Sequence, residues 1–186
     1  PRLMTDIWLV RHGEAAAGFD QDTDPALSAL GREQAAQSAE HLLRHVPDRA
    51  ALLSSPKLRA IQTGEPFAHA RAGALEVDER FVELPSPNAL AARKAWIQEV
   101  LQGHWSGLPE SVHLWREEIS AAILSCTSPT VIFTHFLVIN AVAARMSGED
   151  TVLQCLPANG SVHHLRVEGQ AWRWISRGDM LESVVN

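Results

Sequence analysis

Cysteine, surplus basic charge and long hydrophobic runs are all scarce in this 186-residue sequence, and each shortage excludes a class of protein. The two cysteines, Cys126 and Cys155, are isolated and form no CxxC pair. We therefore expect buried thiols in a reducing compartment rather than a disulfide framework. No apolar run reaches the roughly 18 residues of a membrane span, and no hydrophobic stretch typical of a signal peptide opens the chain. These features predict a cytoplasmic protein without a membrane partner.

Acidic residues outnumber basic ones, which gives a formal net charge of −6. Nonspecific nucleic-acid binding needs a broad basic surface, so we expect no nucleic-acid partner. Any phosphate site must then be a local cluster of positive side chains. With 46% hydrophobic and 20% charged residues, the composition is that of a soluble globular protein, and the length suits one domain.

Strand and helix signals alternate from end to end, which predicts an α/β fold with a mostly parallel central sheet. The clearest core strand is 130–134, which is apolar and rich in β-branched residues. The alternating segments 161–167 and 171–176, joined at 168–170, predict a hairpin. That hairpin forms the antiparallel C-terminal edge of the sheet.

Helix signals lie between the strands. Ser28 is a good N-cap for a helix to about residue 46, and Pro56 suits the first turn of the next helix, which Pro66 should kink or end. Ser86 and Pro87 suit the start of a helix to about residue 102, and another is expected over 110–125. We interpret residues 1–186 as a single domain, with 84–127 as a helical cap or flanking insertion.

Four polar residues follow predicted strands at the point where each strand ends. Arg11 and His12 come after the strand 6–10, Arg59 lies on the first turn after the strand 50–53, and His135 follows the strand 130–134. Open α/β sheets bind ligands at the carboxyl ends of their strands, so the four side chains are expected to converge. Cations beside an imidazole suit an oxyanion, with the imidazole as its nucleophile.

These residues stand in motifs that resemble the histidine phosphatase superfamily, also called the phosphoglycerate mutase-like family. The resemblance covers most of the chain in the order of the family. Its motifs here are Leu9-Val10-Arg11-His12-Gly13-Glu14, Leu27-Ser28 with Gly31 and Gln34-Ala35, Ser54-Ser55-Pro56-Lys57-Leu58-Arg59-Ala60-Ile61-Gln62-Thr63, Thr134-His135 and Asn159-Gly160-Ser161.

The resemblance implies a three-layer α/β/α fold and a phosphatase that works through a covalent phosphohistidine. His12 is the implied nucleophile, and Arg11, Arg59 and His135 are the implied ligands of the phosphoryl oxygens. Glu83 best matches the acid that protonates the leaving oxygen, and Glu79 is the alternative. Because side chains supply the positive charge, no metal and no cofactor is expected.

Three positions depart from the family pattern. Phe136 stands where glycine usually follows the second histidine, Gly18 stands where many members carry asparagine, and Leu84-Pro85-Ser86-Pro87 replaces the glycine-rich stretch after the acid. A non-catalytic phospho-ligand binder is therefore an alternative, and a phosphoglycerate mutase a more distant one. The expected partner is a phosphorylated small molecule or a phosphohistidine protein, and the sequence does not indicate the oligomeric state.

Overall fold

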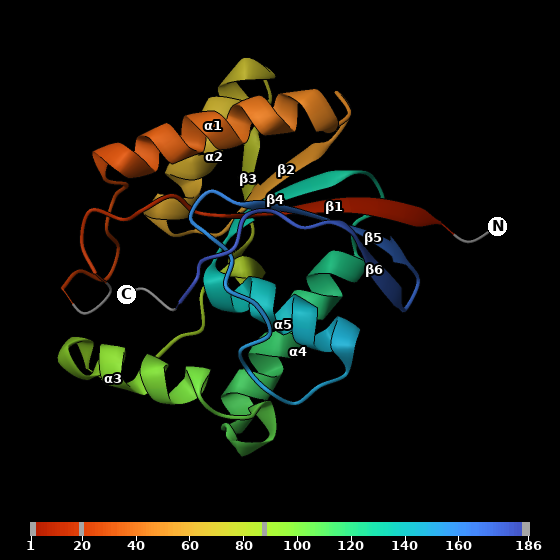
Figure 1. The fold of residues 1–186 in the computed structure, drawn as a ribbon. Coiled ribbons are helices and arrows are strands. Elements are labelled where there is room, and N and C mark those ends of the chain that lie inside the picture. The colour runs from red at the N-terminus through yellow and green to blue at the C-terminus, as the bar shows by residue number, and fades with distance from the viewer. Residues whose placement is uncertain (1–2, 19–20, 87–88, 184–186) are drawn as a thin grey trace.

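Six strands form one sheet in the computed structural model, which describes residues 3–18, 21–86 and 89–183 (Figure 1). The strand order is β3-β2-β4-β1-β5-β6. The strands are β1 (Met4–Arg11), β2 (Ala51–Ser54), β3 (Leu75–Val77), β4 (Thr130–Thr134), β5 (Val162–Glu168) and β6 (Ala171–Ser176). The pairs among β3, β2, β4 and β1 are parallel, and β5 pairs antiparallel with both β1 and β6. The predicted mostly parallel sheet with an antiparallel C-terminal edge is confirmed.

Helices cover both faces of the sheet. They are α1 (Ala29–His45), α2 (Leu58–Ala70), α3 (Leu90–Leu101), α4 (Glu110–Leu124) and α5 (Phe136–Ser147), with 3₁₀ turns η1 (Glu79–Phe81) and η2 (Trp105–Gly107). Helices α1 and α2 pack on one face, and α4 and α5 on the other (Figure 1). The three layers expected of the fold are therefore present. Among the described residues, no helix combines the length and apolar character needed to cross a membrane.

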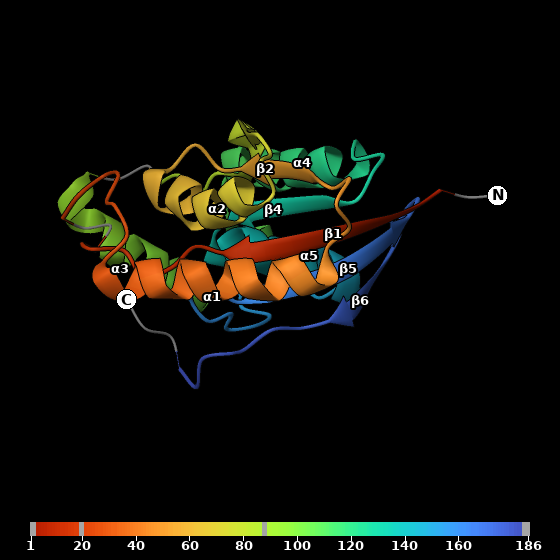
Figure 2. The ribbon, with the colours of Figure 1, turned by 90° about the horizontal axis from the view of Figure 1, so that it is seen from above.

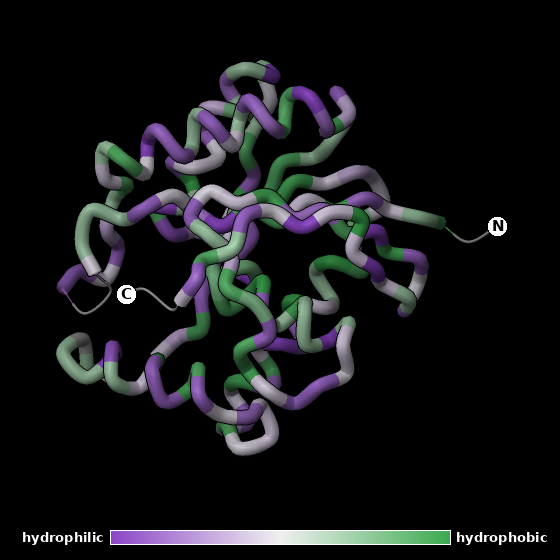
Figure 3. Tube along the Cα trace, in the orientation of Figure 1, coloured by the Kyte–Doolittle hydropathy of each residue, from purple (hydrophilic) through white to green (hydrophobic). Residues whose placement is uncertain are grey.

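Alternation along β1 divides the core between the two faces. Ile7 and Leu9 pack with α4 and α5, whereas Trp8 and Val10 pack with α1 and α2. Every residue of β4 is buried, because this central strand is covered on both faces. Hydrophobic residues accordingly mark the central strands in Figure 3.

The two helices of the segment 84–127, α3 and α4, lie in different parts of the fold. Helix α4 belongs to the layer that covers the sheet, while α3 lies beside the end of the sheet toward which the arrow of β1 points (Figure 2). Buried Val100 and Leu101 attach the end of α3 to the α4–α5 core.

Two helix boundaries differ from the sequence-based expectation. Helix α2 continues through Pro66 to Ala70, so Pro66 does not end it. Phe67 and Ala68, directly after the proline, are buried against the sheet, and this burial outweighs the one backbone hydrogen bond that proline cannot donate. Helix α3 begins at Leu90 with Ala89 as N-cap, four residues after Ser86; Pro87 lies outside the described residues.

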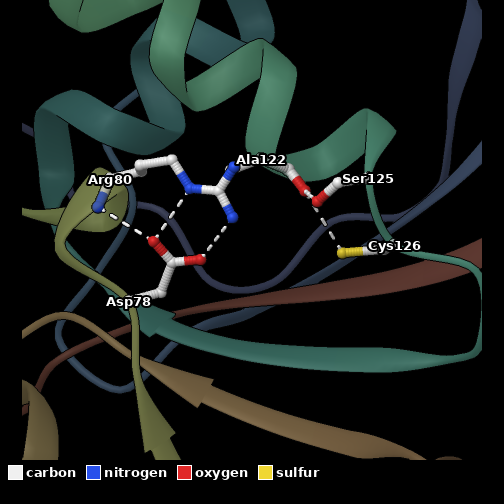
Figure 4. A network of polar contacts seen from close by, with 5 residues as sticks. All are labelled: Asp78, Arg80, Ala122, Ser125 and Cys126. Carbon is white, nitrogen blue, oxygen red and sulfur yellow. Dashed lines mark hydrogen bonds and ion pairs between the residues drawn. The ribbon is translucent and has the colours of Figure 1, made fainter.

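The turn after β3 is held by an ion pair that Figure 4 shows from close by. Asp78 accepts from Arg80 through the backbone N–H at 3.0 Å, Nε at 3.0 Å and Nη2 at 2.8 Å. The next residue, Phe81, is fully buried, and its carbonyl accepts from the Thr134 hydroxyl at 2.7 Å. This turn leads the chain toward Glu83 in a fixed direction.

The two cysteines are separate free thiols. The Cys126 thiol lies 3.5 Å from the Ala122 carbonyl oxygen, in the network of Figure 4. Burial raises the pKa of both thiols, which favours their neutral form.

Candidate active site

The carboxyl ends of β1 and β4 meet where the chain leaves the sheet toward opposite faces. The chain passes from β1 to α1 on one side and from β4 to α5 on the other (Figure 1). Open α/β sheets bind ligands at such a divergence, and the place where it occurs in this chain is called the crevice below. Arg11 is the last residue of β1, and His135 caps α5 directly after β4. His12 and His135 thus lie next to each other, with ring centroids 5.2 Å apart.

Arg59 enters the same crevice from the first turn of α2, which follows β2. Its Nε donates to Nε2 of His12 at 3.3 Å. The positive charge of Arg11 also acts on both histidines. The four residues that the sequence grouped at strand ends therefore share one crevice, although they come from three strands.

His12 is held in one tautomer by its neighbour. Its Nδ1 lies 2.7 Å from the Gly13 carbonyl oxygen, which can only accept, so Nδ1 carries the proton. Nε2 then keeps its lone pair and turns it toward Arg59. Burial, followed by the charges of Arg59 and Arg11, lowers the pKa of His12 well below its ordinary value. His12 is therefore a neutral imidazole with an available lone pair at pH 7.

The two arginines are partly buried and lie close enough for their charges to interact. Burial lowers the pKa of Arg11 to about 10, against the opposing effect of Glu83. Burial also lowers the pKa of Arg59, while the carboxylates of Glu83 and Asp24 raise it. Arg11 donates through Nη1 to the Pro157 carbonyl at 2.8 Å, which fixes its position. Both remain cations at neutral pH.

Two buried polar atoms in the crevice have no hydrogen-bond partner among the residues the structure describes. They are Nε of Arg11 and Nδ1 of His135. Buried polar groups are nearly always satisfied in folded proteins. An anion that accepts from nitrogen would satisfy atoms of this kind.

Glu83 lies where α5 begins. Its Oε1 accepts from the backbone N–H of Leu137 and of Leu84, each at 3.2 Å. Burial raises its pKa, against the lowering effects of these N–H groups and of Arg59 and Arg11. A carboxyl with a raised pKa retains its proton to higher pH and can donate it. Glu79, the alternative acid, is exposed in η1.

Several residues that the sequence analysis gave no role hold the site together. The Thr63 hydroxyl accepts from the backbone N–H of Gly13 at 2.9 Å and donates to the Arg59 carbonyl at 2.7 Å. Asn159 donates to the His12 carbonyl at 3.1 Å, and the Ser55 hydroxyl lies 2.7 Å from Nε2 of His135. All three residues stand in the quoted motifs, but periodicity and residue type alone do not reveal such tertiary bonds.

The loop after His12 is fixed by a close contact with α1. A Cβ at Gly13 would lie 2.5 Å from the Gly31 carbonyl oxygen, and a Cβ at Gly31 would lie 2.1 Å from the Glu14 carbonyl oxygen. Ser28 caps α1 by accepting from the Gly31 N–H at 3.0 Å. Glycine is required at both positions because two backbones touch there.

The structure shows where two departures from the family pattern, Phe136 and Gly18, lie. Phe136 is the first residue of α5, and its ring centroid lies 5.1 Å from Cζ of Arg11, so the ring forms part of the wall beside this guanidinium. Gly18 lies in the loop between β1 and α1, where its carbonyl accepts from Gln21 at 2.9 Å. From its sequence, we expect the loop 19–25 to contribute to substrate specificity; Phe19, its first residue, lies outside the described residues.

His41 and His45 lie four residues apart on α1, a spacing that can bind metal, and they are not among the crevice residues described above. Their rings stack with centroids 4.2 Å apart, and Nδ1 of His45 lies 2.8 Å from the His41 carbonyl oxygen. Across the described part of the chain, no group of three or more His, Cys, Asp or Glu side chains is arranged to hold a metal ion.

Known proteins share this architecture. YhfR of Bacillus stearothermophilus is 20% identical over 95% of this chain and 98% of its own, with a TM-score of 0.74. A phosphoserine phosphatase of Entamoeba histolytica, solved with 3-phosphoglyceric acid, is 18% identical over 95% and 98%, with a TM-score of 0.73. A mycobacterial glucosyl-3-phosphoglycerate phosphatase in complex with VO3 is 20% identical over 96% and 99%, with a TM-score of 0.69.

A sequence comparison with curated proteins gives no match. The family comparison does: the sequence model of the histidine phosphatase superfamily (branch 1) matches residues 7–180, nearly the whole chain, including every residue of the crevice described above. This chain belongs to the histidine phosphatase superfamily.

Proposed function

We propose that this protein is a phosphatase that hydrolyses a phosphomonoester, or a phosphohistidine on a protein, through a covalent phosphohistidine at His12. The observation that carries the proposal is the tautomer of His12. Its Nδ1 proton is donated to the Gly13 carbonyl, and Nε2 keeps the lone pair that accepts from Arg59 and that would attack phosphorus once Arg59 turns to the substrate. Neighbours of the same fold that are named as phosphatases support this reaction class.

In the first step, the lone pair of His12 Nε2 forms a bond to phosphorus while the bond from phosphorus to the leaving oxygen breaks. Arg59 turns from Nε2 to the phosphoryl oxygens, which Arg11 and His135 also contact. Fixed cations in a water-poor site stabilise the charge that these oxygens carry in the transition state. The proton of Glu83 passes to the leaving oxygen, which departs as an alcohol.

In the second step, water attacks the phosphohistidine. Glu83, now a carboxylate, takes one proton from that water as the new oxygen–phosphorus bond forms. The bond between phosphorus and Nε2 breaks, and its electron pair returns to the imidazole. Inorganic phosphate leaves, and both His12 and Glu83 regain their starting protonation. The reaction needs no metal, because the guanidiniums supply the positive charge.

Turnover of para-nitrophenyl phosphate between pH 5 and 7, with and without a chelator, tests the proposal. We expect the same rate with the chelator, and a loss on the order of 10⁴-fold or more in His12→Ala. His45→Ala is the matched control, because His45 is an exposed histidine on α1, and it should retain wild-type activity. Radiolabelled substrate under rapid mixing should leave a base-stable, acid-labile label that His12→Ala lacks.

The competing function, a non-catalytic phospho-ligand binder, gives a different result in the same assay. It predicts no turnover and no label, while vanadate or phosphate still raises the melting temperature of the wild-type protein. Turnover that persists in His12→Ala would instead contradict covalent catalysis at this residue.

A further inference from the structure

Ser55 contacts the second histidine of the crevice from a fully buried position. Its hydroxyl oxygen lies 2.7 Å from Nε2 of His135, and both residues are completely buried. The backbone of Ser55 is fixed by a bond from its N–H to the Phe133 carbonyl at 2.9 Å. Its carbonyl accepts from the Ser54 hydroxyl at 2.8 Å. The contact with His135 is therefore part of a rigid arrangement after β2.

The direction of this hydrogen bond follows from the partners of the hydroxyl. The Lys57 backbone N–H donates to the Ser55 oxygen at 3.2 Å, which occupies one lone pair and leaves the hydroxyl hydrogen in need of an acceptor. Within the part of the chain that the structure describes, the one acceptor recorded at hydrogen-bond distance from this hydroxyl is Nε2 of His135. A buried hydroxyl hydrogen without an acceptor is costly, so Ser55 donates and Nε2 accepts.

This direction decides which nitrogen of His135 carries the proton. A neutral imidazole has one protonated nitrogen, and since Nε2 accepts, the proton must lie on Nδ1. Nδ1 is also the buried ring atom that has no partner among the described residues. In the opposite tautomer Nδ1 would present a lone pair to the crevice, and a lone pair repels an anion.

We propose that Ser55 is a positioning residue: it donates to Nε2 of His135 and thereby holds the ring proton on Nδ1, where the N–H is a donor to a phosphoryl oxygen. The tautomer follows from the hydrogen bonds alone, whereas the role toward a phosphoryl oxygen rests on the proposed phosphatase function. Ser55 completes a symmetrical design, because the Gly13 carbonyl fixes His12 in the tautomer of a nucleophile and Ser55 fixes His135 in that of a donor.

Two-bond ¹H–¹⁵N NMR of the histidine-labelled protein tests the tautomer without reference to activity. The signals of His135 are assigned by their loss in His135→Gln. We expect a protonated Nδ1 and an unprotonated Nε2 in the wild-type protein at pH 7. A proton on Nε2 in this spectrum would overturn the proposal, and the measurement needs no variant of Ser55 that folds.

Variants then separate a positioning role from a packing role. Ser55→Ala should lose the single tautomer of His135 and lower kcat/KM about tenfold, chiefly through kcat, less than the loss of an entire oxyanion donor. Thr130→Ala is the matched control: it removes a buried hydroxyl that donates to the Ser128 carbonyl at the start of β4, away from His135, and it should change neither the tautomer nor kcat. An unchanged tautomer in Ser55→Ala, or equal loss of kcat in both variants, would contradict the role of Ser55. If the tautomer is as expected but the protein shows no turnover, the proposed phosphatase function is wrong. The assignment of the His135 proton to Nδ1 is then still correct.

Discussion

Replacing Glu83 with glutamine is the sharpest test of the acid, because it removes the transferable proton and keeps the shape of the side chain. The amide oxygen of glutamine can still accept from the backbone N–H of Leu137, as Oε1 of Glu83 does at 3.2 Å. General acid catalysis typically contributes 10²–10⁴-fold. We expect a loss in this range, about 3–5 kcal/mol in the activation free energy, for an alkyl phosphate whose leaving alkoxide needs a proton.

Nitrophenol behaves differently, since it is a good leaving group without protonation. Glu83→Gln should therefore slow para-nitrophenyl phosphate by less than about tenfold. The measurement is kcat/KM of both substrates at one pH, for the wild-type protein and for Glu83→Gln. Glu79→Gln serves as the matched control, because Glu79 is exposed nearby in η1 and should have no effect on either substrate.

Equal losses on the two substrates would refute the reasoning, because they would show that Glu83 does not protonate the leaving oxygen. A selective loss with the alkyl phosphate in Glu79→Gln would reassign the acid to Glu79. The raised pKa of Glu83 would then be only a consequence of its burial.

Three further expectations concern pH and packing. With an alkyl phosphate, kcat/KM should rise with pH as His12 loses its proton, at a pKa that lies below the ordinary 6.5. It should fall at higher pH as Glu83 loses its proton, at a pKa that lies above the ordinary 4.5. The falling limb should disappear in Glu83→Gln. Gly13→Ala forces a Cβ to 2.5 Å from a backbone oxygen of α1 and should destabilise the protein by about 1–3 kcal/mol and abolish most activity, whereas Gly107→Ala, which meets nothing within 4 Å, should do neither. Burial lowers the pKa of His163 to about 4. Above pH 6.5 this group therefore contributes about 3 kcal/mol to the free energy of unfolding, and the contribution is lost as the pH falls toward 4. Urea unfolding at pH 7 and 4.5 should therefore show a smaller acid-side loss of stability in His163→Gln.

The sequence predicts the sheet well because the hydrophobic pattern is strongest in strands whose side chains are completely buried, such as β4. The strand at 130–134 is apolar throughout and lies in the centre of the sheet, and the alternation over 161–176 is that of an antiparallel edge. Local sequence preference is a weaker guide where tertiary burial competes with it. Of the two outcomes expected at Pro66, a kink or an end, the end does not occur, because the buried residues after it continue α2 to Ala70.

The candidate site was predictable to the extent that it consists of residues at strand ends. Arg11, His12 and His135 lie at the ends of two strands that are neighbours in the sheet, and their position in the sequence is enough to predict this location. Ser55 and Thr63 could not be found in this way, because their roles depend on bonds across 80 and 50 positions of the chain. The preference for Glu83 over Glu79 stays a prediction, which the partial burial of Glu83 and its bonds to the Leu84 and Leu137 N–H groups support.

Phe136 shows how a departure from the family pattern can leave the chemistry of the site in place. Its ring lies against the Arg11 guanidinium and helps to exclude water from it. That burial lowers the pKa of Arg11 to about 10, which still leaves the group charged at neutral pH. A cation that has lost part of its hydration shell interacts more strongly with an oxyanion, because the surrounding dielectric is lower. An aromatic ring at this position therefore leaves the positive charge of the site in place.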